Sequence, residues 1–549
     1  MNYFTLDMEW NPETAQFQCA VLYSPKHSHI EKKSVLNLIE NGIFKIEEKE
    51  NIIFAHYGGA SDFLFLLREL VGKKSVYILE KEFYEVGGKI ISFSIIYKGK
   101  KFQFRDSYAI LYDGLDKLAQ SFIGQKKIYD SSKLETKQEQ LKQCFNDAKM
   151  LWEIIESFMN ELNLEYLPLT YSSLAFSDMK KRCDFSKLII QTKEDYEHFL
   201  PWFSGGHVDV YKRYSKSVFQ YDIKSSYPFS QYNYGCPIGN FKMVSKRKQG
   251  KAGLYTISCN SKLYNPFLWY KYNSKLYFVN GQCWFYVTDI ELDKLEELNI
   301  EYKILGGFEW NLDKDFFKDF VSYWFNYKER GGARRLIGKY MLNGGGYGKW
   351  AIKRNRDKIV FGNEAERFFS PDFNIGVKKE WVDFSYSQIH IASRITAGGR
   401  ILLFEAQEAF KHEQLCYSDT DSVHVHDYAI REEQKFLGGL NFENSYNRGY
   451  WLGNKFYGLA SDSEFKCILK GFPEKFYEEN FKQALKGNLT FKYSKQKLLK
   501  FRSALSRSSD FVAIREFLRE VKSLEIKRKL DSNGITTQPY FVTSNGELK

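Results

Sequence analysis

Two carboxylates separated by one residue, Asp419 and Asp421, are the side chains with the clearest potential for chemistry in this sequence. Apolar residues before them and the Val423/Val425 alternation after them predict a helix, then a strand, a turn and a second strand. Two carboxylates at one turn repel each other and lose solvation, so a positive group should compensate them. A divalent metal ion held by oxygen ligands would do so. A solvated Asx-rich turn is the alternative for such a triplet taken alone.

A third acid, Asp222, lies at the end of a predicted strand over Val218–Ile223. Ser225, Tyr227 and Pro228 follow it. Pro228 should restrict Tyr227 to an extended backbone, so that the chain turns after the strand. The backbone amides of that turn could then face a triphosphate.

A predicted helix downstream combines an apolar stripe with a cationic face. Arg335, Lys339 and Asn343 recur at every fourth position. The stripe on another face consists of Leu336, Ile337, Tyr340 and Met341. Such a cationic face suits the triphosphate of a nucleotide.

Four further acids lie on separate predicted elements of the N-terminal third. Asp7 and Glu9 share one face of a predicted strand over residues 3–10, and Asp62 lies near the start of an apolar helix. Asp147 heads an amphipathic helix. Two Mg²⁺ ions that activate water for phosphodiester hydrolysis need such a set of acids. Each acid taken alone is read most simply as a surface charge.

The elements that position these side chains belong to a chain of 549 residues, long enough for several domains. Its formal charge of +12 favours a polyanionic partner, with a solubility surplus as the alternative. The eight cysteines include no Cys-x-x-Cys pair, which argues against a zinc site and a disulfide framework. No apolar run reaches membrane-spanning length, and the first residues read as a strand rather than a signal peptide. We therefore expect an intracellular protein with no membrane partner.

Together these motifs resemble those of family B DNA polymerases, in the branch that starts from a protein primer. Asp222 to Pro228 resembles motif A, Lys339 to Gly348 motif B, and Tyr417 to Ser422 motif C. Motif B departs from the family pattern because Gly replaces Ser and one extra residue separates Asn343 from Tyr347.

The resemblance implies roles for individual residues. At the polymerase site it implies metal binding by Asp222, Asp421 and Ile223, with catalytic support from Asp419 and Lys339. The nucleotide-binding residues that it implies are Tyr227, Ser225, Arg335, Lys339, Asn343 and Tyr347. Tyr227 would stack under the incoming sugar and exclude a ribose 2′-hydroxyl.

The N-terminal acids resemble the three motifs of the proofreading 3′–5′ exonuclease domain of this family, which has an RNase H-like fold. The implied catalytic and metal-binding residues there are Asp7, Glu9, Asp62 and Asp147. Three positions depart from the family: Tyr57 replaces Asn, Ser61 replaces Phe, and Gln143 replaces a Tyr that helps to orient the attacking water. Because all four carboxylates remain, we expect an active but slow exonuclease.

Further residues are predicted to contact DNA because their surroundings resemble DNA-contacting segments of the family. They are Phe203, Gly205, Gly206, Arg400, Lys455, Tyr457, Lys126 and Ser107. A plain turn is an equally good interpretation of residues 201–207, and a solvated surface is the usual one for Lys126. The basic run from Lys482 to Arg502 suits a thumb that grips duplex phosphates.

The predicted fold class is multidomain, α/β and α+β, with an exonuclease-like domain over residues 1–195 and a right-hand polymerase domain over 196–549. The polymerase domain is expected to comprise a palm (196–234 and 381–450), a first insertion (235–315), fingers (316–350), a second insertion (351–380) and a thumb (451–549). The second insertion is charged and irregular, and a disordered loop is its alternative interpretation.

The predicted function is template-directed DNA synthesis from a protein primer by two-metal nucleotidyl transfer, with 3′–5′ proofreading and strand displacement. The expected cofactor is Mg²⁺, two ions per site, with Mn²⁺ as a substitute. The expected partners are template and primer DNA, dNTPs, a terminal protein that acts as primer, and a single-stranded-DNA-binding protein. The expected location is the host cytoplasm for a phage protein, or the nucleus or an organelle otherwise. The alternatives are a decayed nucleic-acid-binding scaffold and an exonuclease without polymerase activity.

Overall fold

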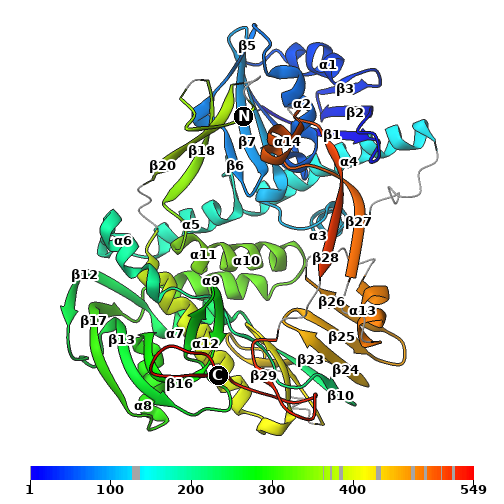
Figure 1. Ribbon diagram of the computed structural model, residues 1–549. Helices are drawn as coiled ribbons and strands as arrows, with labels where there is room; N and C mark the ends of the chain where they lie inside the picture. The colour runs from blue at the N-terminus through cyan, green and yellow to red at the C-terminus, as the bar shows by residue number, and fades with distance from the viewer. Residues whose placement is uncertain are drawn as a thin grey trace.

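The computed structural model describes residues 2–126, 136–362, 364–370, 374–382, 387–427, 434–470, 477–486, 491–508, 510–521 and 526–549. Figure 1 shows the N-terminal part in blue and cyan at the top of the view, with the larger remainder below it. No helix in the described ranges is both long enough and apolar enough to cross a membrane.

An eight-stranded mixed sheet forms the N-terminal part, in the order β3-β2-β1-β4-β8-β7-β5, with β6 paired to β7. Its strands are β1 (Asn2–Trp10), β2 (Phe17–Ser24), β3 (His27–Glu31), β4 (Glu50–Ala55), β5 (Val76–Ile78), β6 (Tyr84–Val86), β7 (Lys89–Tyr97) and β8 (Lys100–Asp106). Central strand β1 pairs antiparallel with β2 and parallel with β4. The two strands expected here from the sequence are both present.

Helices cover both faces of this sheet. Ile53 and Ala55 of β4 pack in one core with α2 (Asp62–Leu70) and α1 (Val35–Asn37). Ile52 and Phe54 of the same strand pack with α3 (Leu115–Phe122) and α4 (Lys137–Glu161). Because alternate residues of a strand point to opposite faces, α2 and α4 lie on opposite sides of the sheet.

Helix α4 corrects one expectation about Asp147. The helix begins at Lys137, so Asp147 lies in its interior and not at its head. Thr136 and Glu139 form a capping box that satisfies the first free backbone amides of the helix. The helix therefore begins ten residues earlier than expected.

A five-stranded antiparallel sheet in the order β23-β11-β22-β21-β9 forms the region predicted as the palm. Its strands are β9 (Val208–Val210), β11 (Val218–Ile223), β21 (Leu415–Asp419), β22 (Ser422–Val425) and β23 (Leu440–Tyr446). Helix α12 (Ile389–Glu408) packs on this sheet through Leu403 and Ala406, and α7 (Ser226–Tyr234) packs on α12. The helix and the strand–turn–strand expected around Asp419 are thus present.

The region of the predicted first insertion is a second five-stranded sheet, in the order β12-β17-β13-β16-β31. Its elements are β12 (Cys236–Val244), β13 (Ala252–Ser261), β14 (Trp269–Tyr272), β15 (Lys275–Phe278), β16 (Asn280–Thr288), α8 (Asp289–Glu297) and β17 (Tyr302–Asp313). The last strand, β31 (Phe541–Val542), comes from the C-terminal segment and places Val542 in the core of this unit. The end of the segment predicted as thumb therefore packs with the region of the predicted first insertion.

The region of the predicted fingers is helical. Helices α9 (Lys318–Lys328), α10 (Gly332–Gly344) and α11 (Tyr347–Trp350) share one apolar core with α4 and α5 (Tyr171–Arg182). Helix α6 (Lys193–Phe199) spans the predicted domain boundary at residue 195, and its Tyr196 and Phe199 pack with Leu254 of the second five-stranded sheet. The predicted boundary at residue 195 therefore falls within a helix that packs with this second sheet.

The region of the predicted second insertion is ordered rather than irregular. It forms an antiparallel sheet in the order β18-β20-β19, from β18 (Asn355–Phe361), β19 (Arg367–Ser370) and β20 (Ile375–Trp381). Ile359, Ile375 and Val377 give it an apolar face that packs into the same core as α2. That face explains why a charged segment still forms a sheet.

The region of the predicted thumb contains a four-stranded sheet and a long hairpin. The sheet consists of β10 (Tyr214–Ser215), β24 (Arg448–Gly453), β25 (Phe456–Ala460) and β26 (Phe465–Leu469), and α13 (Tyr477–Leu485) follows it. The hairpin pairs β27 (Phe491–Leu498) with β28 (Ile514–Val521) and carries α14 (Phe501–Ser508) at its tip. Figure 1 shows this hairpin, in orange and red, reaching up to the N-terminal sheet.

One face of helix α14 docks on the N-terminal part. Phe501 and Leu505 are buried in the same core as α2. Arg502 forms ion pairs with Glu85 at 2.6 Å and with Asp357 of β18 at 3.0 Å. Arg502, included in the basic run expected to grip duplex phosphates, is therefore engaged within the protein.

Candidate functional site

The turn between β21 and β22 presents two of the predicted carboxylates. Asp419 pairs with Ser422, so Thr420 and Asp421 form a two-residue loop. The Asp421 N–H donates to the Asp419 carbonyl at 2.6 Å, and Thr420 between them has φ 63°. A β-branched residue in this conformation costs about 1–3 kcal/mol, so its surroundings must hold it. The Thr420 N–H donates to the His207 carbonyl at 2.7 Å.

Asp222 meets this turn from the neighbouring strand β11. Strand pairing places it opposite Ser422, and the Ile223 N–H donates to the Asp421 carbonyl at 2.7 Å. Because the Ile223 side chain is a hydrocarbon, only its backbone carbonyl could act as the predicted metal ligand. Two predicted metal-binding segments that are far apart in the sequence thus converge.

The two converging carboxylates have raised pKa values. Burial raises the pKa of Asp222 to about 8, and the charges of Asp421 and Glu443 add to the increase. Burial likewise raises the pKa of Asp421 to about 6, and the charge of Asp419 adds to it. Nearby lysines oppose these increases only in part. The pair therefore has less positive charge around it than two ionised carboxylates require, which suits the binding of a cation.

Asp419, in contrast, is compensated within the protein. Its two carboxylate oxygens accept from Lys455 Nζ at 2.8 and 2.7 Å, and one also accepts from Tyr417 Oη at 3.1 Å. The Tyr457 ring packs 5.1 Å from that of Tyr417. These contacts distinguish Asp419 from Asp421, and the division between Asp421 as the direct ligand and Asp419 as its support stays a prediction.

Two charged residues beside Asp222 were missed by the sequence reasoning. Lys328, at the end of α9, donates to Ser225 Oγ at 2.8 Å, and its charge opposes the raised pKa of Asp222. Glu443 of β23 accepts from Gln220 Nε2 at 2.9 Å. Neither residue lies in a recognisable motif. Tertiary packing alone brings each of them to the site, so the sequence did not indicate them.

The cationic face of α10 is present as predicted. Arg335, Lys339 and Asn343 are exposed, whereas the stripe formed by Leu336, Ile337, Tyr340 and Met341 is buried. The helix ends at Gly344, and α11 starts at Tyr347. The extra residue of this motif therefore falls in a break between two helices, which leaves the cationic face regular.

Tyr227 lies between the palm sheet and the fingers helices. Its ring centroid is 4.7 Å from that of Tyr347, which in turn lies 6.2 Å from Phe203. Tyr227 is helical and not extended as expected, because α7 already begins at Ser226. Pro228 is tolerated there since the first turn of a helix does not need its missing N–H.

A second group of carboxylates gathers on the N-terminal sheet. Burial raises the pKa of Asp7 well above its ordinary value, and the charges of Asp147, Glu9 and Asp62 raise it further. The Asp7 Oδ2 atom is buried without a hydrogen-bond partner. Burial raises the pKa of Asp62 to about 6. The fold thus brings together all four acids predicted from separate elements.

Asp106 is a fifth acid near this group that the sequence reasoning did not single out. It accepts from the backbone amides of Tyr108 at 3.0 Å and Gly59 at 3.3 Å. Burial raises its pKa to about 7, and the charge of Asp62 contributes. Its position at the end of β8, next to the parallel strand β4, is the only signal that could have indicated it.

Among the described residues, no three Asp, Glu, His or Cys side chains are arranged to hold a metal ion by themselves. Backbone carbonyls, solvent or substrate oxygens would have to complete any such site, as is usual for Mg²⁺.

A family model described as DNA polymerase type B, organellar and viral, matches residues 123–423, more than half of the chain. The chain belongs to this family. It is 24% identical to a DNA polymerase of Kluyveromyces lactis over 91% of its length, and 22% identical to a probable DNA polymerase of Neurospora intermedia over 67%. It spans only 61% and 43% of those two relatives. A DNA-directed DNA polymerase of Enterobacteria phage PRD1 is 23% identical over 79% of this chain and 78% of the phage protein.

The fold agrees with that of solved polymerases. Phi29 DNA polymerase in complex with primer-template DNA and incoming nucleotides superimposes with a TM-score of 0.73 at 16% identity, over 95% of this chain and 99% of that chain. The same polymerase with single-stranded DNA gives a TM-score of 0.71. The predicted fold class, an exonuclease domain followed by palm, fingers and thumb, is confirmed.

Arg400 has a different place from the one expected of a primer-phosphate ligand. Its side chain is fully buried and forms an ion pair with Glu291 at 2.8 Å. Its Nη1 donates to the carbonyls of Ser204 at 3.3 Å and Gly205 at 3.2 Å. A guanidinium so engaged cannot reach a phosphate, so in this structure it connects α12 to α8 and to the segment at Ser204 and Gly205.

Ser107, predicted to contact DNA, is also fully buried. Its Oγ lies 3.0 Å from His56 Nδ1 and 3.3 Å from the Ala55 carbonyl. Burial of this hydroxyl makes it a support for His56, which follows β4. Lys126 is exposed, at the edge of the described residues.

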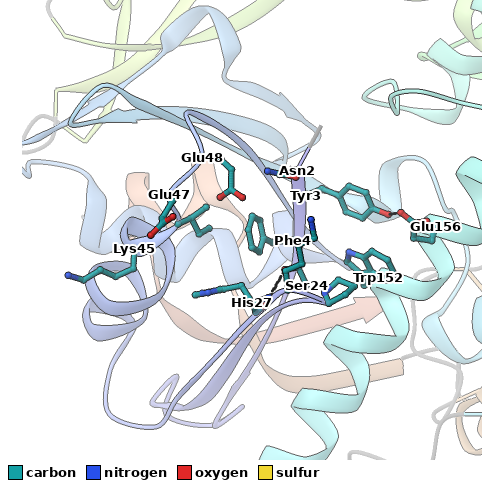
Figure 2. A pocket seen from close by; sticks show the side chains of 13 residues that line it. Asn2, Tyr3, Phe4, Ser24, His27, Lys45, Glu47, Glu48, Trp152 and Glu156 are labelled. Carbon is teal, nitrogen blue, oxygen red and sulfur yellow. Dashed lines mark hydrogen bonds between the residues drawn. The ribbon is translucent and has the colours of Figure 1, made fainter.

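Figure 2 shows a cavity of about 640 Å³ at the start of β1. Its walls include the rings of Tyr3, Phe4 and Trp152 and three carboxylates, Glu47, Glu48 and Glu156. The Tyr3 hydroxyl donates to Glu156. Because Asp7 and Glu9 lie toward the other end of the same strand, this cavity is separate from the candidate exonuclease site.

Proposed function

We propose that this chain is a template-directed DNA polymerase with a 3′–5′ exonuclease site in its N-terminal domain. The observation that carries the proposal is the convergence of Asp222 and Asp421 on the palm sheet, both with raised pKa values. The exposed cationic face of α10 supplies the charge that a nucleotide triphosphate needs.

The carboxylates fit divalent ions at both sites. Asp222, Asp421 and the Ile223 carbonyl would hold ions in the palm, and Asp7, Glu9, Asp62 and Asp147 would hold them in the exonuclease domain. The buried, unpartnered Asp7 Oδ2 is an oxygen that lacks a positive group. When bound, such ions would activate the attacking oxygen and neutralise the leaving oxygen.

The remaining residues would bind and orient the substrates. Arg335, Lys339 and Asn343 would contact the phosphates of the incoming dNTP. Tyr227, packed against Tyr347, would lie under its sugar and exclude a 2′-hydroxyl. Lys328, held by Ser225, adds a positive charge beside Asp222 that the sequence reasoning had not assigned.

The deciding experiment is the incubation of the purified chain with primed template, dNTPs and Mg²⁺. Extension of the primer supports the polymerase. Binding without extension would favour the alternative of a decayed scaffold, and degradation alone would favour an exonuclease without polymerase activity.

Protein priming is the finer part of the proposal. It is supported by two elaborations of the polymerase domain at the places where the protein-primed branch has insertions, the sheets β12-β17-β13-β16-β31 and β18-β20-β19. A terminal protein would then offer a hydroxyl to the first nucleotide, with strand displacement and a single-stranded-DNA-binding protein in support of later synthesis. A reaction with origin DNA tests this: covalent labelling of a separate protein by a nucleotide supports it.

Gly206 provides a steric test of the joint next to the palm site. A Cβ there would lie 2.8 Å from Thr420 Oγ1 and 2.9 Å from the Tyr227 hydroxyl, whereas none of the neighbouring atoms is within 4 Å at Gly205. We expect Gly206→Ala to reduce primer extension about tenfold or more, because a small displacement of these groups is costly. Gly205→Ala is the matched control, and equal losses in the two variants would contradict the steric explanation.

A row of tyrosines beside the exonuclease carboxylates suits stacking with single-stranded bases. Tyr57 stacks on Tyr108 at 3.8 Å, Tyr108 lies 4.6 Å from Tyr112, and Lys89 Nζ lies over both Tyr57 and Tyr108. Tyr57 is 39% exposed and replaces the family's Asn. It could therefore offer a ring to a base, with Lys89 near the phosphate.

Replacing Tyr57 by Leu should weaken the binding of a single-stranded oligonucleotide by about 1 kcal/mol, on the scale of one base stack. The measurement is fluorescence titration of an oligonucleotide with 2-aminopurine at its 3′ end, in EDTA to prevent cleavage. Tyr77→Leu, at a 66%-exposed tyrosine at the edge of the same sheet, is the control. Unchanged binding by Tyr57→Leu would exclude this row as a stacking surface.

A further inference from the structure

A buried ionic network lies directly beneath the turn that carries Asp421. Asp209 of β9 accepts from His207 Nε2 at 2.9 Å and lies 3.4 Å from Arg528 Nη1. The side chains of these three residues are at most 1% exposed. A carboxylate removed from water to this degree requires a positive or hydrogen-bonding partner, and Arg528 is the guanidinium that faces it.

Arg528 belongs to the C-terminal segment and not to the palm. Its guanidinium lies 4.5 Å from the ring centroid of Tyr211, and its Nη2 donates to the Tyr264 carbonyl at 3.2 Å. Its Nε donates to Thr537 Oγ1 at 3.1 Å, and this hydroxyl donates to the Val210 carbonyl at 2.6 Å. The short hairpin β29 (Lys529–Leu530) and β30 (Thr537–Gln538) is thereby attached to the end of β9.

Strand β9 leads from this attachment to the polymerase carboxylates. It pairs with β21, with Val208 opposite Asp419. His207, at its start, has its ring stacked on Phe278 at 3.9 Å and accepts from the Thr420 N–H through its carbonyl. This hydrogen bond holds the one β-branched residue whose left-handed backbone shapes the turn.

A second connection runs through side chains. Tyr211, which lies under Arg528, accepts from Gln407 Nε2 at 2.9 Å, and Gln407 also donates to Ser418 Oγ at 3.0 Å. Ser418 directly precedes Asp419. Both connections begin at Arg528: the first ends at Thr420, next to Asp421, and the second ends at Ser418, next to Asp419.

We propose that Arg528 and Asp209 are positioning residues for the palm carboxylates. The C-terminal segment holds β9 and the His207 carbonyl through this ion pair, so that Thr420 keeps the turn that places Asp421 beside Asp222. The expected loss of primer extension rests on the proposed polymerase function. The structural consequence, a less constrained Thr420–Ser422 turn without Arg528, can be measured separately.

The test uses the full chain with four variants. Arg528→Met removes the positive charge, Arg528→Lys retains it, and Asp209→Leu with Arg528→Met removes both members of the pair. Arg354→Met is the control, because Arg354 is equally buried and lies over the ring of Tyr196 at 5.5 Å without contacting the turn. The readouts are hydrogen–deuterium exchange of residues 415–425, primer extension, 3′ degradation and Tm.

Arg528→Met should accelerate exchange at the turn and reduce the maximal extension rate about 10–100-fold, as expected when a metal ligand moves by about 1 Å. Degradation, carried out in the other domain, should stay within about twofold, since it shares none of these contacts. Arg528→Lys should recover part of the extension. The double variant should recover Tm, since no uncompensated charge remains, but not extension.

The proposal is overturned if Arg528→Met leaves exchange at 415–425 unchanged, or if the double variant restores both Tm and extension. It is also overturned if Arg354→Met accelerates the same exchange. A wild-type chain that fails to extend a primer would contradict the proposed function instead, and the exchange data would still decide the role of Arg528.

Discussion

The Asp222→Asn variant should lose primer extension by about a thousandfold or more while it still degrades a 3′ end. The loss follows because Asp222 is one of two carboxylates that would hold the ions in the palm, and the amide cannot replace a charged oxygen ligand. Degradation should be spared because the acids predicted for the exonuclease site lie on β1, α2 and α4 of the N-terminal part. The measurement is single-turnover extension and degradation on the same primed template.

The same substitution should also stabilise the protein at neutral pH without divalent ions. The pKa of Asp222 is raised to about 8 in the folded chain, so its ionisation is disfavoured by folding. The wild type therefore loses stability as the pH rises from about 4 to about 8, and the Asn variant lacks this loss. We expect a Tm about 2–4 °C higher at pH 8 and equal at pH 4.

Extension by Asp222→Asn at a wild-type rate would refute the assignment of the palm site. Asn441→Asp is a useful comparison. Asn441 of β23 lies opposite Asp222 of β11, so this substitution adds a second carboxylate beside Asp222. That variant should lower Tm at pH 8, the opposite direction from Asp222→Asn.

The second large effect concerns the exonuclease domain. Replacing Asp7 and Asp62 by Asn should reduce 3′ degradation about a thousandfold or more, with extension within about twofold of the wild type. Asp7 is the acid most affected by its neighbours, since burial and the charges of Asp147, Glu9 and Asp62 all raise its pKa. The double replacement removes two of the four carboxylates that would attract divalent ions.

The measurement is degradation of a labelled single strand across a Mg²⁺ titration. Glu13→Gln, at an exposed acid of the same domain, is the control and should behave as the wild type. Retained degradation in the double variant would place the nuclease site elsewhere. A parallel loss of extension would show that the two sites are not independent.

Gln143 is the predicted departure from the family that would slow such degradation. It is buried four residues before Asp147 on α4, and both polar atoms of its amide lack a hydrogen-bond partner. The expectation of a slow exonuclease from the sequence therefore stays a prediction. The free amide shows only that the position can offer a donor and an acceptor.

Local patterns were sufficient to place most of the carboxylates on their elements. The apolar residues of β1, β4, β11, β21 and β22 predicted strands that the structure contains. The four-residue period of Arg335, Lys339 and Asn343 predicted the exposed face of α10. Such patterns are readable because the side-chain period of a helix or strand is set by the backbone itself.

Local patterns failed where packing decides the outcome. Pro228 predicted an extended backbone at Tyr227. Helix α7 instead begins at Ser226 and accepts proline in its first turn. Arg400 was expected at a phosphate, yet Glu291 of α8 binds it in the interior. No spacing in the chain signals Glu291 as the partner of Arg400, since α8 is distant from α12 in sequence.

The sequence by itself determined the family, the fold class and the residues that could bind metal ions and nucleotides, because those residues lie in short motifs with regular spacing. Only the tertiary structure showed that Lys328, Glu443 and Asp106 join these sites and that Arg528 is bound beneath the Asp421 turn. The physical reason is that charge compensation and burial depend on which elements meet in space. The periodicity of side chains along the backbone does not indicate which elements pack together.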